Sequence, residues 1–494
     1  MLRKVPLIVI LGSTGTGKTK LSLQLAERFG GEIISADSMQ VYTNLDIATA
    51  KATKEEQLRA KHHLLDVATP AEPFTVTHFR NAALPIIEQL LAKSKPPIVV
   101  GGTNYYIESL LWDILVNTQE QQIMGVADQQ LTTEQMFDMT TLELHQHLSS
   151  IDASSANRIH PNNRRKIERA IEVFQSTGQT LTAKLMEQRQ QPGGNRLGGP
   201  LRYPHTILLW LRCQQDVLNN RLDGRVDGML QQGLLKELRQ FHNSYADVTV
   251  QAYTKGVLQT IGYKEFVPYL LKYKQEQDDS LQEYLQTHQY QLPTKQQLLT
   301  MEGELAESLQ LLSSCCDELK LVTRRYSKKQ LKWINNRFLA SKDRQVPDLY
   351  ELDTSDVNSW QDCVYKKAES IIESYRLDEI TEIAPMPKRI HPGAGLNEET
   401  SNFCGICERH FIGEYQWELH LKSNKHKRRR ESKRRKEREA SEGEKRVKME
   451  LKTATKTETG TETVATQIQS PEDRGADGAE DEGTSISNSD PNRS

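Results

Sequence analysis

A glycine-rich segment near the start of the chain has the residue types that hold a phosphate group. Residues 12–19 read GSTGTGKT and match the pattern G-x-x-x-x-G-K-[ST]. In that pattern, backbone N–H groups and the start of a helix surround an anion, and Lys18 adds a positive charge. We expect a diphosphate or triphosphate there, with a plain glycine-rich turn as the alternative. The expected ligands are Thr14, Gly15, Thr16, Gly17, Lys18 and Thr19, and Thr19 is also expected to hold Mg²⁺.

Two further polar segments each follow an expected strand. Residues 35–42 read SADSMQVY, and residues 101–106 read GGTNYY. Because ligands bind at the edge where the carboxyl ends of parallel strands meet, Asp37 and Thr103 are expected to face the phosphate site. Each residue taken alone fits a turn or a helix cap equally well. Their combination with the glycine-rich segment favours a functional site.

The carboxyl-terminal part of the chain has cysteines and histidines at the spacing of a metal site. The pattern is Cys404-x₂-Cys407-x₁₂-His420-x₅-His426, which fits the Cys₂His₂ class. Four protein ligands leave no open position, so we expect tetrahedral, structural Zn²⁺. His410 lies inside the loop and is expected at the surface. The other four cysteines follow no ligand spacing and are expected to be ordinary thiols.

The pattern of apolar residues predicts the elements that position these groups. Continuous apolar runs indicate buried parallel strands, expected at 5–11, 32–35, 98–100 and 206–211. Helical spacing of apolar residues recurs at 18–29, 216–241 and 305–338. Strands that alternate with helices predict an α/β fold with a parallel-sheet core.

Composition divides the chain into parts. The strand signal disappears over 117–200, which we expect to be a helical insertion in an α/β core formed by 1–116 and 201–345. Within that core, the Gln-rich residues 272–300 are expected to be a surface excursion. We expect a linker at 346–400 and a small ββα-like zinc finger at 401–430. The composition beyond the finger cannot bury a core, so we expect a disordered tail, basic and then acidic, at 431–494.

The formal net charge of the 494 residues is only −2, from 64 Lys and Arg against 66 Asp and Glu. That sum argues against a uniformly basic nucleic-acid-binding protein, but the charges are segregated. Residues 151–200 carry a net +4 and residues 401–450 a net +6, and acidic stretches elsewhere offset them. No apolar run approaches the roughly 20 residues of a membrane span. Six cysteines without a signal peptide fit a reducing compartment.

With these motifs in this order, the chain resembles the tRNA dimethylallyltransferases (tRNA isopentenyltransferases), and closely the eukaryotic branch with a carboxyl-terminal zinc finger. The resemblance rests on GSTGTGKT, SADSMQVY, GGTNYYIESLLW, RIHPNNRRKIERAIEVF, RVDGMLQQGLLKEL, TIGYKEF and the finger, which span residues 5–430. It implies transfer of the dimethylallyl group from dimethylallyl diphosphate, held with Mg²⁺, to N6 of adenosine 37 in the anticodon loop of certain tRNAs. The implied product is N6-isopentenyladenosine.

The resemblance also implies roles for individual residues. Asp37 corresponds to the general base that takes a proton from N6, and Thr103 to a contact with the substrate adenosine. Arg225 is assigned to the diphosphate leaving group, and Lys18 and Thr19 are the other expected catalytic residues. The pocket around the target adenine is expected to be completed by Ser38, Met39 and Gln40.

Two basic stretches are expected to contact tRNA. Residues 158–166 lie in the insertion, which the family uses to hold the anticodon stem-loop, and residues 324–333 interleave basic and aromatic side chains. Charge runs are usually solvated faces, but the aromatics and the resemblance favour RNA contacts. Weaker candidates are Gly262, Tyr263 and Lys264. The residues expected to contact tRNA in the two stretches are Pro161, Asn162, Asn163, Arg164, Arg165, Arg324, Arg325, Lys328, Lys329 and Trp333.

Two alternatives belong to other functional classes. A P-loop nucleotide kinase or NTPase, acting on RNA or a small substrate, would share the glycine-rich segment, but no clear strand ends in a second metal-binding Asp. A non-catalytic RNA-binding protein would need only the finger and the basic stretches, and the intact Lys18, Thr19 and Asp37 argue against it. The basic run 427–438 fits RNA binding and nuclear localisation equally. We expect a cytoplasmic monomer, with mitochondrial and nuclear pools as further expectations and no membrane partner.

Overall fold

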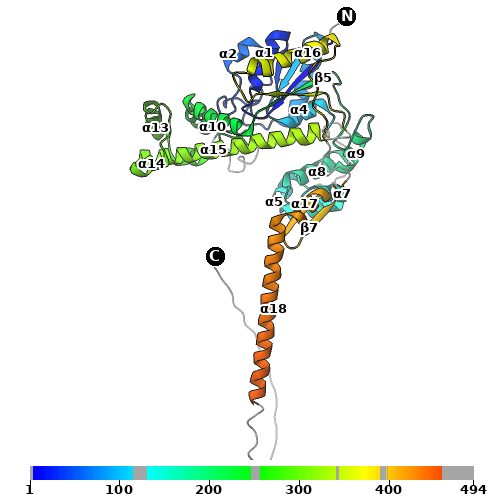
Figure 1. Ribbon diagram of the computed structural model, residues 1–494, viewed down its shortest axis with the longest axis vertical. Helices are drawn as coiled ribbons and strands as arrows, with labels where there is room; N and C mark the ends of the chain where they lie inside the picture. Colours follow the sequence, from blue (N-terminus) through cyan, green and yellow to red (C-terminus); the bar gives the residue numbers. More distant parts are fainter. Residues whose placement is uncertain are drawn as a thin grey trace, which may run out of the picture. The chain divides into compact units, whose positions relative to one another are not determined.

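The computed structural model describes residues 4–114, 131–245, 256–340, 344–389, 396, 397 and 399–458. Its largest part is built on a six-stranded sheet with strand order β3-β2-β4-β1-β5-β6 (Figure 1), in which all neighbouring strands are parallel. The predicted α/β parallel-sheet core is therefore confirmed. The strands are β1 (Leu7–Gly12), β2 (Glu32–Ser35), β3 (His62–His63), β4 (Pro97–Val100), β5 (Thr206–Arg212) and β6 (Leu349–Asp353).

Helices precede, follow and connect these strands. They are α1 (Lys18–Phe29), α2 (Lys54–Arg59), α3 (Val76–Ala92), α4 (Asn104–Leu111), α5 (Thr133–Asp138), α6 (Thr141–Ile151), α7 (Ala153–Arg158), α8 (Arg164–Thr177), α9 (Leu181–Gln190), α10 (Gln215–Gln231), α11 (Leu234–Tyr245), α12 (Val267–Lys272), α13 (Gln275–Thr287), α14 (Lys295–Thr300), α15 (Glu304–Ile334), α16 (Lys366–Leu377), α17 (Glu414–Lys422) and α18 (Asn424–Glu458).

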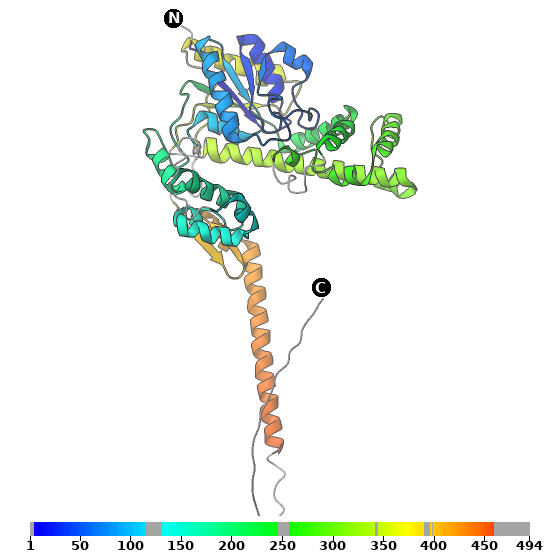
Figure 2. The same ribbon diagram turned by 180° about the vertical axis from the view of Figure 1, so that it is seen from behind.

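Helices cover both faces of the sheet, which is why its strands are continuous apolar runs. Along β1, Ile8 and Ile10 share a core with α1 and α16, whereas Val9 and Leu11 share a core with α3 and α4. This alternation follows from the two-residue period of a strand. The long helix α15 runs past the sheet (Figures 1 and 2) and contacts β1 and α4. Residues after β1, β2 and β4 therefore meet α15 at one edge.

The helices outside the sheet form two further cores. Helices α6, α7 and α8 bury their own apolar residues, such as Leu148 and Ile167, and residues 117–130 of the predicted insertion lie outside the described residues. The predicted surface excursion at 272–300 needs correction. Its Gln-rich face is exposed, but Leu281 and Leu285, four residues apart on α13, are buried in the core that α15 shares. Two leucines in an otherwise polar segment are too few to predict from the sequence that this helix packs against a core.

The predicted linker at 346–400 is wrong for much of its length. Leu349, Tyr350 and Leu352 are buried in β6, which pairs with β5, and α16 packs on the sheet. The acidic and Pro-rich composition of this region hid a strand of only five residues. After α16, the chain returns to β6 at the edge of the sheet, where Met386 N donates to the Leu349 carbonyl at 2.7 Å.

The carboxyl-terminal region contains a hairpin of β7 (Ser401–Cys404) and β8 (Arg409–Ile412), followed by α17 and α18. The predicted disorder from residue 431 is wrong up to residue 458, because these residues are helical. Lys, Arg and Glu have high helix propensity, and pairs such as Arg435–Glu439 at i,i+4 add support. Residues 427–449 of this helix are exposed and pack on no core. No helix in the described part of the chain is long and apolar enough to cross a membrane.

Candidate active site

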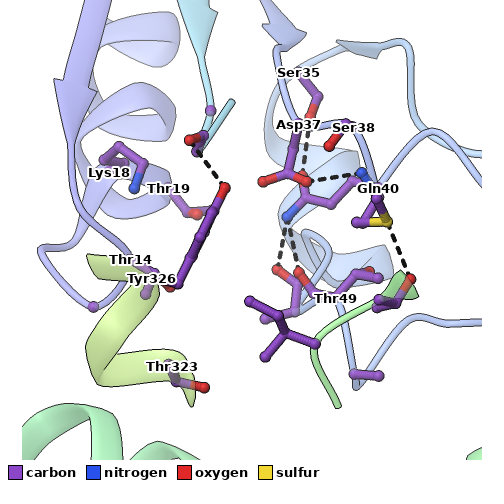
Figure 3. A pocket seen from close by; sticks show the side chains of 18 of the residues that line it. Thr14, Lys18, Thr19, Ser35, Asp37, Ser38, Gln40, Thr49, Thr323 and Tyr326 are labelled. Atoms are coloured by element: carbon purple, nitrogen blue, oxygen red, sulfur yellow. Dashed lines mark hydrogen bonds between the residues drawn. The ribbon is translucent and has the colours of Figure 1, made fainter. Parts of the chain in front are cut away.

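A cavity of about 590 Å³ lies at the carboxyl ends of β1, β2 and β4. The glycine-rich loop, residues 12–19, forms one side, and residues 35–40 form the other, so Lys18 and Asp37 lie on opposite sides (Figure 3). Sequence reasoning placed the site at this edge. The predicted residues that line the cavity are Thr14, Gly15, Gly17, Lys18, Thr19, Asp37, Ser38, Met39, Gln40, Arg225 and Lys264.

The glycine-rich loop has the backbone geometry of an anion site. Gly15 (φ 82°) and Gly17 (φ 86°) adopt the left-handed region, where glycine is favoured. No side chain caps the start of α1 after Gly17, so its first N–H groups are available to an anion. Thr16 differs from the prediction in one respect. Its hydroxyl is buried and donates to the Ser13 carbonyl at 2.8 Å, which leaves only its backbone for a ligand.

Lys18 and Thr19 bring two kinds of ligand-binding atom to the loop. Lys18 Nζ donates to the Ser13 carbonyl at 2.8 Å. Burial lowers the pKa of Lys18 to about 8, although the nearby Asp37 carboxylate favours the charged form. An incoming diphosphate would stabilise the ammonium. Thr19 is exposed on the first turn of α1, and no hydrogen bond within the described residues engages its hydroxyl.

The segments after β2 and β4 are joined by short hydrogen bonds. Ser38 N donates to Thr103 Oγ1 at 2.9 Å, and Thr103 Oγ1 donates to Ser38 Oγ at 3.1 Å. Asp37 Oδ1 accepts from Met39 N at 3.0 Å. Thr103 thus contacts the segment that carries Asp37, although it is not among the residues that line the cavity. A Cβ on Gly102 would lie only 3.0 Å from Asp37 Oδ2, so the backbone approaches the carboxylate closely.

We predict that Gly102→Ala lowers kcat at least about tenfold, because the new methyl group would lie 2.7 Å from Gln330 Nε2 and 3.0 Å from Asp37 Oδ2 and would displace both side chains. The measurement is steady-state product formation at saturating substrates. Gly228→Ala on α10 is the matched control, since a Cβ there meets nothing within 4 Å. It should leave kcat unchanged and raise Tm slightly. Equal activity of the two variants would contradict the prediction.

Gln40 and Arg225 complete the walls of the cavity. Gln40 Nε2 donates to the carbonyls of Thr49 and Ala50, both at 3.1 Å, so Gln40 shapes the cavity by holding the neighbouring loop. Arg225 on α10 lines the side of the glycine-rich loop, and its Nη1 donates to Thr14 Oγ1 at 3.4 Å. Burial lowers the pKa of Arg225. Together with Lys18, it makes this side of the cavity cationic, and Asp37 makes the other side anionic.

Comparison with known proteins identifies the family of the chain. Residues 40–337 match the family model described as IPP transferase, and residues 5–71 match one described as isopentenyl transferase. A tRNA dimethylallyltransferase of Mus musculus is 42% identical over 434 residues, which cover 86% of this chain and 85% of the relative. The Homo sapiens protein of the same name is 41% identical with the same coverage. The chain belongs to the tRNA dimethylallyltransferase family.

A solved structure extends the likeness to three dimensions. The structure of a eukaryotic dimethylallyltransferase acting on tRNA has a TM-score of 0.68 and 27% identity, and the match covers 90% of this chain and 99% of that one. The resemblance found in the motifs is thereby confirmed. As a member of the family, the protein is a transferase that prenylates tRNA.

The predicted tRNA contacts on α15 divide into two groups. Arg325, Lys328 and Lys329 are exposed, as RNA-binding residues must be. Arg324 instead pairs with Asp223 at 2.5 Å, and Trp333 Nε1 donates to Glu108 Oε2 at 3.1 Å. The side chains of Arg324 and Trp333 are therefore held by partners within the protein.

The insertion shows the same division. Asn162 and Arg165 are exposed, and Pro161 is half-buried. Asn163 caps the start of α8, whereas Arg164 donates to the Met139 carbonyl at 2.6 Å and pairs with Glu168. Among the weaker candidates, Gly262 N donates to Glu265 Oε2 at 2.8 Å, Tyr263 is fully buried, and Lys264 lines the cavity.

The predicted zinc ligands come together in the carboxyl-terminal region. One ligand atom from each of Cys404, Cys407, His420 and His426 lies within 4.8 Å of the others. Cys407 Sγ is 3.6 Å and His420 Nε2 3.1 Å from His426 Nδ1, close to the roughly 3.4 Å between neighbouring ligands of tetrahedral Zn²⁺. Residues 401–427 match the family model described as zinc-finger double-stranded RNA-binding. The donor set and spacing therefore fit Zn²⁺.

Three residues of α15 that line the cavity were not predicted to do so: Thr323, Tyr326 and Gln330. Tyr326 and Gln330 lie within the stretch 324–333, which was expected to contact tRNA. A polar pair four residues apart on one helical face was the signal that could have found Tyr326 and Gln330.

Proposed function

We propose that this protein transfers the dimethylallyl group of dimethylallyl diphosphate to N6 of adenosine 37 in the tRNA anticodon loop, which forms N6-isopentenyladenosine. The observation that carries the proposal is one cavity with a cationic, glycine-rich side and an Asp37 side. A diphosphate and an adenine can then occupy opposite walls. Their reacting atoms would meet between Lys18 and Asp37.

The donor side would stabilise the leaving group. Loop N–H groups, Lys18 and Arg225 would surround the diphosphate, and Thr19 would hold Mg²⁺. When bound, Mg²⁺ neutralises part of the diphosphate charge. The chain's own cations favour the charge that develops as the allylic C–O bond breaks.

The acceptor side would handle the proton. N6 attacks the allylic carbon, the C–N bond forms as the C–O bond breaks, and the N6 proton passes to the Asp37 carboxylate. Thr103 would orient the segment that carries Asp37 through its two bonds to Ser38. Adenosine 37 has to leave the anticodon stack to reach the cavity.

The finger is proposed to add affinity for tRNA and not to take part in the chemistry. We predict that Cys407→Ser removes Zn²⁺ and weakens tRNA binding about tenfold through lost phosphate contacts, whereas kcat at saturating tRNA persists. Metal content and tRNA Kd are the measurements. Cys213→Ser, which changes a cysteine outside the cluster, is the control. Loss of turnover at saturating tRNA would contradict the prediction.

We also propose a monomer in the cytoplasm. The thiols of Cys213, Cys315, Cys316 and Cys363 support a reducing compartment.

The experiment that tests the function uses the purified protein with dimethylallyl diphosphate, Mg²⁺ and unmodified tRNA. Digestion and mass spectrometry should find N6-isopentenyladenosine. A parallel reaction with ATP tests the kinase or NTPase alternative. Robust ATP hydrolysis without the modified nucleoside would overturn the proposal.

A further inference from the structure

Gln330 lies between the two sides of the cavity. Its side chain is buried on α15, with the residue only 3% exposed. Gln330 Oε1 accepts from Thr14 N in the glycine-rich loop at 2.9 Å, and Gln330 Nε2 donates to the Gly102 carbonyl at 2.9 Å. The backbone carbonyl of Gln330 accepts from Asn104 Nδ2 at 3.3 Å. One side-chain amide therefore joins the backbones of two loops that are distant in sequence.

The bond to Gly102 reaches the neighbourhood of the proposed base. A Cβ on Gly102 would lie 2.7 Å from Gln330 Nε2 and 3.0 Å from Asp37 Oδ2, so the amide and the carboxylate flank the same glycine. Tyr326 OH also donates to the Gly102 carbonyl, at 3.2 Å. A shift of Gln330 would move the backbone against which Asp37 packs.

We propose that Gln330 is a positioning residue, which fixes the separation between the diphosphate site and Asp37. The inference rests on the proposed function. Both polar atoms of the Gln330 side chain bond to these loops, at Thr14 N and the Gly102 carbonyl, so we assign its effect to the loops. Transfer requires reacting atoms held about 3–3.5 Å apart. The glycine-rich loop would bind the donor, and the Gly102 backbone packs against Asp37 on the acceptor side.

Loss of the acceptor oxygen and loss of the donor nitrogen of the Gln330 amide have different consequences. Without Gln330 Oε1, the half-buried Thr14 N–H loses the acceptor that the structure gives it, and a lost hydrogen bond costs free energy. Without Nε2, the Gly102 carbonyl keeps the Tyr326 hydroxyl. A protonated glutamic acid has both a hydroxyl donor and a carbonyl acceptor in nearly the same shape as glutamine. Burial favours that neutral form.

The test compares Gln330→Met with Gln330→Glu. Gln330→Met should lower kcat about tenfold and weaken binding of inorganic pyrophosphate several-fold, with tRNA Kd unchanged. Gln330→Glu should show the same loss at alkaline pH. Its activity relative to wild type should recover as the pH falls, because the carboxyl group becomes protonated and restores both hydrogen bonds. The ratio for Gln330→Met should stay flat with pH.

Ser327→Ala is the matched control, because Ser327 is buried one turn earlier on α15 and its hydroxyl donates only to the Arg324 carbonyl. It should leave both kcat and pyrophosphate binding unchanged. If Gln330→Glu follows Gln330→Met at every pH, or if pyrophosphate binding and kcat stay at wild-type values in both, the inference is overturned. Failure of wild type to form N6-isopentenyladenosine would instead defeat the proposed function, and the pyrophosphate measurement would still test the link between the loops.

Discussion

Replacing Asp37 with asparagine should lower kcat by about 10²–10⁴-fold, the usual contribution of a general base. The amide has nearly the same shape and can still accept the bond from Met39 N, but it cannot take the N6 proton. Single-turnover formation of N6-isopentenyladenosine at saturating substrates is the measurement. Binding of tRNA should change only a few-fold.

The control for this variant is Asp362→Asn, which removes an exposed carboxylate paired with Lys366. It should behave as wild type. A collapse of tRNA binding in Asp37→Asn, with the single-turnover rate preserved at saturation, would make Asp37 a docking residue and contradict its role as base.

Replacing Lys18 with methionine should lower kcat/KM for dimethylallyl diphosphate by about 10²–10³-fold, because a preorganised charge at the leaving group is lost. The wild-type pH profile provides a second measurement. Burial lowers the pKa of Lys18 to about 8, so the free protein carries the charge below that pH and loses it above. The wild-type kcat/KM for the donor should therefore fall as pH rises through about 8.

Lys18→Met should lack this alkaline limb. Lys20→Met is the matched control, because Lys20 is exposed two residues later and lies over the Trp360 ring instead of in the cavity. Its profile should match wild type. An alkaline limb that persists unchanged in Lys18→Met would assign the titration to another group.

The motifs predicted which residues would meet at one edge of the sheet because each motif is short, contiguous and tied to a strand end. Gly15, Gly17 and Lys18 follow β1, and Asp37 follows β2, so the order of strands and loops was enough to bring them to one edge. The metal ligands of the finger were visible for a similar reason, since their spacing within one short segment fixes their geometry.

The rest depends on contacts between distant segments. Gln330 reaches Thr14 across 316 positions, and no local pattern encodes that bond. Arg324 and Trp333 have the residue types of RNA contacts, but buried or half-buried acidic partners on other helices engage them. The short strand β6 and the helix α18 were missed because amino-acid composition indicates whether a segment can stay in solvent. It does not indicate whether a strand pairs with a neighbour or whether a polar segment is helical.

The proposed role of the N6 amine can be tested at a single atom. Wild-type protein, dimethylallyl diphosphate and Mg²⁺ would be incubated with two tRNAs, one with adenosine at position 37 and one with purine riboside, which lacks the amine. Mass spectrometry of the anticodon-loop fragment should show one added dimethylallyl group in the first tRNA and none in the second. Transfer to the purine-riboside tRNA, or no transfer to either, would contradict N6 prenylation in the cavity between Lys18 and Asp37.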